Sequence, residues 1–232
     1  MLGVPCPRQV RSALAAWGPR LHAEWQAAAR EIGVDLTVMR ACPRVGTDCS
    51  GLEAPVLALV AMGIRHRHVS SCDCAPSAQS FLKANTAKPG GPLRPAGSVV
   101  PAHYPDMLRR DHNAMPDLDV YVCGFPCQPF STLHHGSRVF RDPKARPFYA
   151  MLATIRARLP ALAVLENVVG IHRVLGRVWR HLLALRWCTR SQLIRRTWAS
   201  PYAARGPIFF WFARTWRTLS RTASSLAWPA LA

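Results

Sequence analysis

Short apolar runs alternate with helix-length stretches through the central part of this chain, and this alternation limits its possible folds more than any other feature. Each apolar run is too short for a helix, and each is followed by apolar residues at helical spacing. Repeated strand and helix units are typical of an α/β layered fold with a mostly parallel sheet. The expected strands and helices are 44–48 with 55–62, 68–71 with 77–84, 119–123 with 146–159, and 161–165 with 172–185.

Two other regions fall outside this alternation. Residues 8–32 carry apolar side chains at helical spacing and are followed by Gly33, which predicts a leading helix. Residues 88–101 are dominated by Pro, Gly and Ala, which predicts a loop. The expected domains are an N-terminal helical extension over 1–40, an α/β core over 41–185 and an atypical tail over 186–232.

The net charge of the chain is strongly positive. It carries 30 Lys and Arg against 12 Asp and Glu, a formal net charge of +18, which fits a polyanionic partner. Arg, Ala and Pro are all abundant, as GC-rich codons would produce in any protein, so the net charge alone does not decide the partner. Half of the residues are hydrophobic, which excludes a disordered polyelectrolyte.

The cysteines and the N-terminus bear on location and metals. Eight cysteines occur without paired C-x-x-C spacing, so no metal site is expected. The first residues lack the apolar core of a signal peptide, and no apolar run reaches the ~18 residues that a membrane-spanning helix needs. We therefore expect an intracellular protein with reduced thiols and no membrane partner.

The stretch with the most specific chemistry is residues 119–131, Asp-Val-Tyr-Val-Cys-Gly-Phe-Pro-Cys-Gln-Pro-Phe-Ser. A buried strand is expected to run into Gly124 and Pro126, which force a tight turn and present Cys127 at the carboxyl end of the strand. An attacking thiolate would be useful there. A structural cysteine is the simpler interpretation of an isolated Cys, but the specificity of the whole pattern argues against it.

Residues 124–131 resemble, residue for residue, the nucleophile loop of DNA cytosine-5 methyltransferases. Upstream, residues 46–55, Gly-Thr-Asp-Cys-Ser-Gly-Leu-Glu-Ala-Pro, resemble the first motif of that family, a strand-to-helix turn that receives S-adenosylmethionine. Downstream, residues 165–170, Leu-Glu-Asn-Val-Val-Gly, resemble its Glu-Asn-Val motif. The resemblance covers about residues 44–185 and implies a Rossmann-like core of a methyltransferase that depends on S-adenosylmethionine.

The resemblance implies how the nucleophile loop and the Glu-Asn-Val motif would act. Cys127 would add to C6 of cytosine, and Glu166 would protonate or hydrogen-bond N3 as negative charge develops on the ring. Such a Glu works best when partly protonated, so we expect burial to raise its pKa. Taken alone, Glu166 could instead cap a helix or join an ion pair. The implied catalytic residues are Cys127, Glu166, Asn167, Pro126 and Gln128, with Asn167 and Pro126 holding the loop backbones.

The resemblance also implies a site for S-adenosylmethionine, formed by Asp48, Ser50, Gly51, Leu52, Asp73, Asp106, Gly124 and Pro126. Gly51 permits close backbone approach to the cofactor. Asp73 matches the acidic residue that binds the ribose hydroxyls, and Asp106 resembles the one that contacts the adenine amino group. Either could instead be a solvated loop carboxylate. Glu53 departs from the pattern, because the family often has Gly there.

The implied substrate is DNA, with the target base flipped out of the duplex. Gly136, Asp142 and Phe148 match the loop that closes over this base, and His134 and His135 are explained most simply by a basic loop facing phosphates. Arg138, Arg141 and Arg146 are expected to contact the DNA backbone.

Two alternatives to a DNA methyltransferase concern substrate and activity. A branch of this family methylates tRNA with the same motifs, and Ser131, where that branch is expected to favour Thr, favours DNA. A catalytically silent remnant that only binds S-adenosylmethionine or DNA is the third interpretation. We expect a monomer, and a nuclear location if the source is eukaryotic.

The tail differs in composition from the rest. No acidic residue follows Glu166, and eight Arg and five of the eight Trp lie from Arg186 onward. Beyond Leu185 we identify neither strand-like alternation nor the family's Arg-containing strand motif, recognition region and final helix. Codons for residues 197–204, taken in a shifted frame, permit a pattern resembling the family's Gly-Val-Pro-X-Arg-Arg motif. The hypothesis is a frame slip or mis-joined exon near Leu185, and the alternative is a genuine extension that binds nucleic acid through Arg and Trp.

Overall fold

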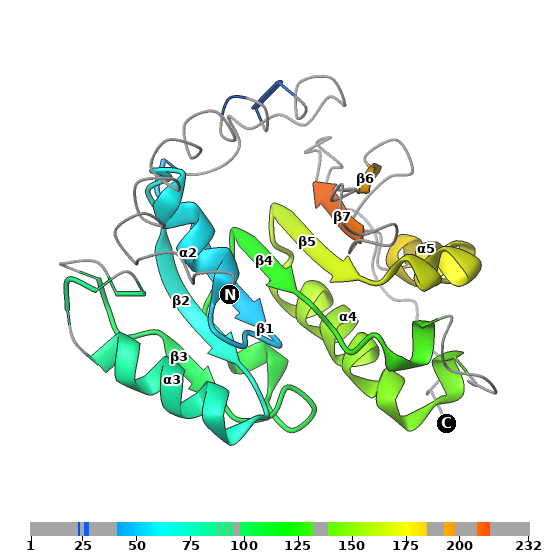
Figure 1. The fold of residues 1–232 in the computed structure, drawn as a ribbon, viewed down its shortest axis with the longest axis horizontal. Coiled ribbons are helices and arrows are strands. Elements are labelled where there is room, and N and C mark those ends of the chain that lie inside the picture. The colour runs from blue at the N-terminus through cyan, green and yellow to red at the C-terminus, as the bar shows by residue number, and fades with distance from the viewer. Residues whose placement is uncertain are drawn as a thin grey trace, which may run out of the picture.

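A parallel β-sheet is the centre of the part of the chain that the structure describes (Figure 1). The structure is a computed structural model, and it describes residues 23, 26–27, 41–87, 89–91, 93–94, 98–131, 139–184, 193–197 and 208–213. Five strands run parallel: β1 (Arg44–Asp48), β2 (Arg67–Cys72), β3 (Ala102–Tyr104), β4 (Val120–Cys123) and β5 (Leu162–Asn167). The predicted α/β fold with a mostly parallel sheet is confirmed, and each predicted strand overlaps an observed one.

Helices cover both faces of this sheet. The α-helices are α2 (Ala54–Ala61), α3 (Pro76–Ala87), α4 (Arg146–Arg158) and α5 (Leu175–Ala184). Shorter 3₁₀ turns are η2 (His112–Ala114), η3 (Gln128–Phe130), η4 (Val139–Arg141), η5 (Pro143–Ala145) and η6 (Val169–Val174). Val120 of β4 lies in an apolar cluster with Leu59 of α2, whereas its neighbour Tyr121 lies in another cluster with Met151 of α4. Because successive strand residues point to opposite faces, α2 and α4 lie on opposite sides of the sheet.

The strand order reverses beside β1. Neighbouring strands follow the order β3-β2-β1-β4-β5-β7-β6, so the chain builds β1 to β3 in one direction and then returns to place β4 on the other side of β1. Asp48 and Cys123, the last residues of β1 and β4, are paired in register. In open α/β sheets ligands bind beyond the carboxyl ends of the strands at such a reversal.

Two antiparallel strands form in the tail, although its sequence shows no strand-like alternation. β7 (Ile208–Ala213) pairs along the whole length of β5, and β6 (Leu193–Thr197) pairs with β7. Sheet pairing uses backbone hydrogen bonds, so an unbroken run such as Ile-Phe-Phe-Trp-Phe-Ala can form a strand without alternating polarity.

Smaller differences concern element length. β3 has only three residues, too few to leave a periodic pattern, and it was not predicted. The helix expected after β5 begins as η6 and becomes α-helical at Leu175. The predicted leading helix lies almost entirely outside the described residues, of which 23, 26 and 27 are helical. Among the described helices, none has both the length and the apolar character to cross a membrane.

Candidate active site

The carboxyl ends of the parallel strands meet at one edge of the sheet, and the predicted site residues lie at or just after these ends (Figure 1). Asp48, Ser50, Gly51 and Leu52 lie at the end of β1, Asp73 follows β2, Asp106 follows β3, Gly124, Pro126, Cys127 and Gln128 follow β4, and Glu166 and Asn167 end β5. Residues far apart in the sequence are therefore brought to one edge.

Cys127 lies in a hydrogen-bonded turn. It directly precedes η3, and its carbonyl oxygen accepts hydrogen bonds from the backbone N–H groups of Phe130 and Ser131, both at 2.9 Å. Phe125 and Phe130 flank it and are buried, with their ring centroids 5.6 Å apart, and Phe125 also packs on Phe148 at 5.5 Å. The thiol itself is free and partly exposed. The loop therefore presents a reachable sulfur from a rigid aromatic anchor.

Glu166 lies directly over the start of this loop. A β-carbon added to Gly124 would lie 3.1 Å from Glu166 Oε2, a distance that nine in ten real β-carbon contacts exceed. The absence of a side chain at Gly124 therefore leaves space for the carboxyl group. Burial raises the pKa of Glu166, in the direction expected from the sequence, because partial removal from water disfavours the charged form.

Asn167 joins the end of β5 to the nucleophile loop. Its side chain is fully buried, and its Nδ2 donates a hydrogen bond of 3.0 Å to the carbonyl oxygen of Phe125. Its Oδ1 accepts a bond of 3.0 Å from the backbone N–H of Val168. Pro126, which follows the bonded carbonyl, is partly buried, and Gln128 is exposed. Asn167 thus fixes the backbone one residue before Pro126.

Gly51 and Asp73 contact each other across the ends of β1 and β2. Gly51 has a φ of +51°, a left-handed conformation that glycine adopts without strain, and its N–H donates to Asp73 Oδ2 at 2.9 Å. The other oxygen of Asp73 accepts from the N–H of Ala75 at 2.9 Å. Ser50 is buried and accepts a bond of 3.0 Å from the N–H of Cys72. These contacts hold the turn after β1 against the end of β2.

Glu53 occupies a backbone conformation that explains why glycine is common in its place. Its φ of 58° is left-handed, and its side chain is nevertheless fully buried. The Thr47 hydroxyl donates to Glu53 Oε1 at 2.6 Å, and His68 Nε2 lies 3.3 Å from the same oxygen. The departure from the family pattern therefore leaves the turn formed, with a buried carboxyl group beneath it.

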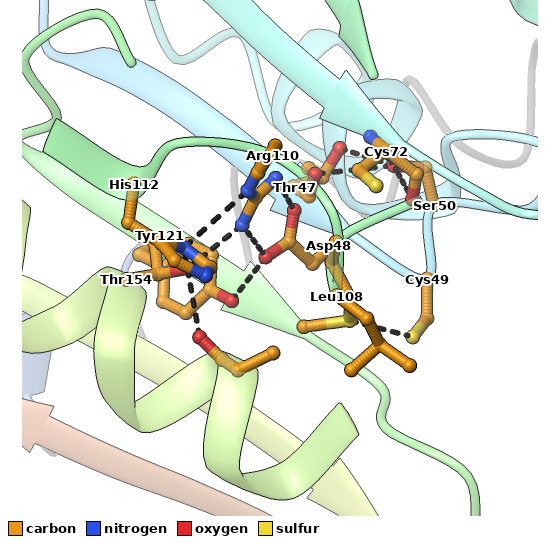
Figure 2. Close-up of polar contacts among 12 residues, drawn as sticks. Thr47, Asp48, Cys49, Ser50, Cys72, Leu108, Arg110, His112, Tyr121 and Thr154 are labelled. Carbon is orange, nitrogen blue, oxygen red and sulfur yellow. Dashed lines mark hydrogen bonds and ion pairs between the residues drawn. The ribbon is translucent and has the colours of Figure 1, made fainter. Parts of the chain in front are cut away.

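The carboxylate of Asp48, which was expected to border the cofactor, is bound by two neighbouring side chains. Its carboxylate forms an ion pair with the buried guanidinium of Arg110 and accepts a hydrogen bond of 2.5 Å from the Tyr121 hydroxyl (Figure 2). Arg110 also donates to Thr154 Oγ1 at 2.7 Å. Sequence reasoning missed Arg110 because the run Arg109-Arg110 does not indicate which of two adjacent arginines is buried.

Leu52 and Asp106 are accessible at the same edge. The Leu52 side chain is 61% exposed in the turn after β1. Asp106 accepts a bond of 2.8 Å from the N–H of Leu108, and its other oxygen lies 3.5 Å from Arg109 Nε. The Asp106 side chain remains 30% exposed, so its carboxylate can still accept a hydrogen bond from a ligand.

The residues expected near the DNA are only partly described. His134, His135, Gly136 and Arg138 lie outside the described residues. Arg141 and Arg146 are exposed, at the end of η4 and the start of α4. Asp142 caps η5 by accepting from the N–H of Lys144 at 2.9 Å, and Phe148 is fully buried among the aromatic rings.

Comparison with known proteins identifies the family of the chain. Residues 49–183, more than half of the chain, match the family described as C-5 cytosine-specific DNA methylase. The chain belongs to this family. Its members use S-adenosylmethionine as the methyl donor, so membership implies that cofactor.

The residues predicted to bind S-adenosylmethionine are chemically suited to this cofactor. A β-carbon on Gly51 would meet no atom within 4 Å, so the backbone there borders open space. Asp73 and Asp106 offer partly exposed carboxylates, the groups that bind ribose hydroxyls and an adenine amino group.

Individual relatives align over limited stretches. The chain is 36% identical over 67 residues to the type II methyltransferase M.BsuFI of Bacillus subtilis, covering 28% of this chain and 16% of that protein. It is 28% identical over 145 residues to the DNA (cytosine-5-)-methyltransferase DMT5 of Cryptococcus neoformans, covering 54% of this chain and 6% of that protein. The chain thus spans a small part of the curated relatives it matches.

Solved structures share the fold. The structure resembles the Dnmt2 methyltransferase of S. pombe with a TM-score of 0.53 at 20% identity, covering 75% of this chain and 52% of that one. It resembles the methyltransferase EhMeth of Entamoeba histolytica with a TM-score of 0.51 at 15% identity, covering 76% of this chain and 54% of that one. At these identities the likeness shows only that the chain has the fold of these methyltransferases.

Proposed function

We propose that this chain forms the donor-binding and nucleophile half of a DNA cytosine-5 methyltransferase. The observation that carries the proposal is the convergence of the ends of β4 and β5. The Glu166 carboxyl group lies against Gly124, and Asn167 binds the carbonyl of Phe125, two residues before Cys127. The acid thereby contacts the same short loop that carries the nucleophile.

The first chemical step is the addition of Cys127 to the ring. C5 of cytosine is a poor nucleophile, so the deprotonated Cys127 sulfur adds to C6 and the electron pair of the C5–C6 double bond moves toward N3. Glu166 donates a proton or a strong hydrogen bond to N3, which limits the negative charge on the ring. A raised pKa suits this role, because the carboxyl group must hold a proton near neutral pH.

The second step restores the aromatic base. When bound, S-adenosylmethionine would supply the methyl group: C5 would take it with its new electron pair as the methyl–sulfur bond breaks, and S-adenosylhomocysteine would leave. Loss of the C5 proton to a base regenerates the C5–C6 double bond and expels the Cys127 thiolate, and Glu166 recovers the N3 proton. Cys127 cannot reach C6 inside a duplex, so the base must be flipped out before the first step.

The donor is proposed to lie against the ends of β1 to β3. Gly51 and Leu52 border it through the turn after β1, Asp73 accepts hydrogen bonds from the ribose hydroxyls, and Asp106 accepts one from the adenine amino group. Ser50 acts indirectly, since its hydroxyl is used to hold the turn to β2. Asp48 is left out of the direct contacts because Arg110 and Tyr121 bind its carboxylate.

Methyl transfer tests the proposal directly. Tritiated S-adenosylmethionine is incubated with the full chain and either mixed-sequence duplex DNA or tRNA, with Cys127→Ser as the test variant. Cys74→Ser, which removes an exposed cysteine after β2, is the matched control. We expect label in DNA for the wild type and Cys74→Ser and none for Cys127→Ser.

Three other results would change the account. Transfer that survives Cys127→Ser would refute the nucleophile, and transfer to tRNA alone would replace the substrate. A wild-type chain that labels neither polymer would contradict the activity and leave a silent methyltransferase fragment.

A further inference from the structure

The segment from Tyr104 to Arg110 forms a loop whose two ends touch through a single guanidinium. The guanidinium carbon of Arg110 lies 5.3 Å from the centroid of the Tyr104 ring, a cation–π contact. Asp106, the proposed adenine contact, lies inside this loop. The C-terminal residue of the loop therefore contacts its N-terminal residue.

The same guanidinium is fixed to the end of β1. Its side chain is 2% exposed, and its Nη1 donates to Asp48 Oδ1 at 2.5 Å while its Nη2 pairs with Asp48 Oδ2 (Figure 2). Nη2 also donates to Thr154 Oγ1 of α4, and Tyr121 of β4 binds the same Asp48 oxygen. Asp48 lies three residues before Gly51, so Arg110 joins the loop of Asp106 to the turn of Gly51.

Buried ion pairs of this kind seldom add much net stability. Removing both charges from water costs about as much as their attraction returns, and apolar replacements are often neutral or stabilising. A planar guanidinium that makes paired bonds does, however, fix the relative position of the elements it touches. The effect of Arg110 on geometry is thus expected to exceed its effect on stability.

We propose that Arg110 is a positioning residue for the methyl donor, because it sets the spacing between the turn of Gly51 and the loop of Asp106. The inference rests on the proposed function and adds a residue to it that touches no substrate. Weaker contacts also span the same gap, among them one between sulfur atoms and one between backbone atoms. Cys49 Sγ lies 3.9 Å from Met107 Sδ, and the N–H of Asp73 donates to the Tyr104 carbonyl at 3.3 Å. Neither has the paired geometry of the Arg110 contact with Asp48.

Two variants separate positioning from simple destabilisation. Arg110→Lys keeps the charge but loses the paired hydrogen bonds. The double variant Asp48→Asn with Arg110→Met removes both charges, so that no unpaired ion is left buried. Arg65→Gln, a change at an exposed arginine between α2 and β2, is the control for loss of positive charge.

The measurements are donor affinity, steady-state kinetics and amide hydrogen exchange on the full chain. In both Arg110 variants we expect the dissociation constant and the KM for S-adenosylmethionine to rise at least about tenfold, because small misplacements of binding groups weaken binding. We expect kcat at saturating donor to stay within about threefold, since the reacting groups are untouched. In the protein without donor, the amides of Met107 and Leu108 should exchange faster than in the wild type and in Arg65→Gln.

The outcomes distinguish this inference from the proposed function. A cooperatively folded double variant with wild-type donor affinity and wild-type exchange at residues 104–110 would overturn the role of Arg110 alone. A fall in kcat with an unchanged KM would overturn it as well. Failure of the wild-type chain to bind S-adenosylmethionine would instead overturn the proposed function on which the inference rests.

Discussion

At the scale of single residues, the contact between Gly124 and Glu166 is the feature on which the proposed chemistry depends most. Gly124 was expected from the sequence to make a turn and to border the donor, but its backbone does not have a left-handed φ. The structure gives another reason for glycine at this position, because a side chain there would crowd the Glu166 carboxyl group. Sequence alone could not have indicated this, because the two residues are 42 positions apart.

Gly124→Ala should therefore displace the acid while leaving the fold intact. The added β-carbon would lie 3.1 Å from Glu166 Oε2, and the end of a side chain can move by a few tenths of an ångström. We expect kcat to fall about tenfold or more, because a small shift of a positioned acid is costly. Gly176→Ala is the matched control, since a β-carbon there meets no atom within 4 Å. Equal activities of the two variants would contradict the contact.

Glu166→Gln tests the raised pKa. If the protonated carboxyl group is the active form, wild-type kcat falls as pH rises through the pKa of Glu166, and the Gln variant loses that limb together with most of the activity. A pH–rate profile of both proteins between pH 5 and 9, a range of about two units on either side of neutral, provides the check. A wild-type profile that rises throughout would show that the ionised form is needed.

The same variant makes a prediction about stability. A carboxyl group whose pKa is raised on folding contributes stability below its unfolded pKa, and that contribution is lost as pH rises through the folded pKa. Glu166→Gln should therefore have a higher Tm than the wild type at neutral and alkaline pH, with the difference shrinking toward acid pH. Thermal unfolding, monitored by circular dichroism, measures the Tm of the wild type and of the variant. A lower Tm for the variant at pH 8 would contradict burial as the cause of the raised pKa of Glu166.

At the scale of elements, the site depends on how β5 is joined to the loop after β4. The strands β4 and β5 were predictable because each is a compact apolar run, and β1 and β2 because a stretch with helical spacing follows each of them. The hydrogen bond from Asn167 to the Phe125 carbonyl was not predictable in detail, although a backbone-holding role was expected for Asn167. Arg110 escaped prediction altogether, because its partners Asp48, Tyr104, His112 and Thr154 come from four separate elements.

Asn167→Ala should uncouple the two elements. It leaves the buried Phe125 carbonyl without its partner, which costs about 1–3 kcal/mol of unfolding free energy. We expect kcat to fall while the KM for the donor changes little, since the donor contacts lie on β1 to β3. Urea unfolding and steady-state kinetics give the two values. Loss of donor affinity with full kcat would contradict this prediction, because it would place Asn167 with the donor-binding residues instead of the nucleophile loop.

At the scale of the whole molecule, the charge and the family match divide the chain near the same place. Residues 1–185 carry 22 basic and 12 acidic residues, a net charge of +10, and the tail adds +8 without any acid. The family match ends at residue 183. The strands β6 and β7 nevertheless pair with β5, so the composition of the tail did not predict its hydrogen bonding. The three expected domains and the frame slip stay predictions.

Sequencing the transcript across the codon of Leu185 tests the frame slip. The hypothesis predicts that a shifted or differently joined frame restores a Gly-Val-Pro-X-Arg-Arg pattern close to the codons of residues 197–204. An uninterrupted frame, together with tail peptides found by mass spectrometry of the purified protein, would contradict it. In that case deletion of residues 186–232 should weaken salt-sensitive DNA binding, as expected of an Arg-rich and Trp-rich extension.

The covalent intermediate is the most direct test of the central claim, that Cys127 attacks cytosine with Glu166 as its acid. DNA that contains 5-fluorocytosine cannot lose a proton from C5, so the adduct persists after methyl transfer. The full chain is mixed with S-adenosylmethionine and this DNA, digested, and searched by mass spectrometry for a nucleotide-linked peptide. We predict one cross-link, on Cys127, which is absent in Cys127→Ser and reduced in Glu166→Gln. A cross-link on another cysteine, or a stable adduct that persists in Cys127→Ser, would contradict the account.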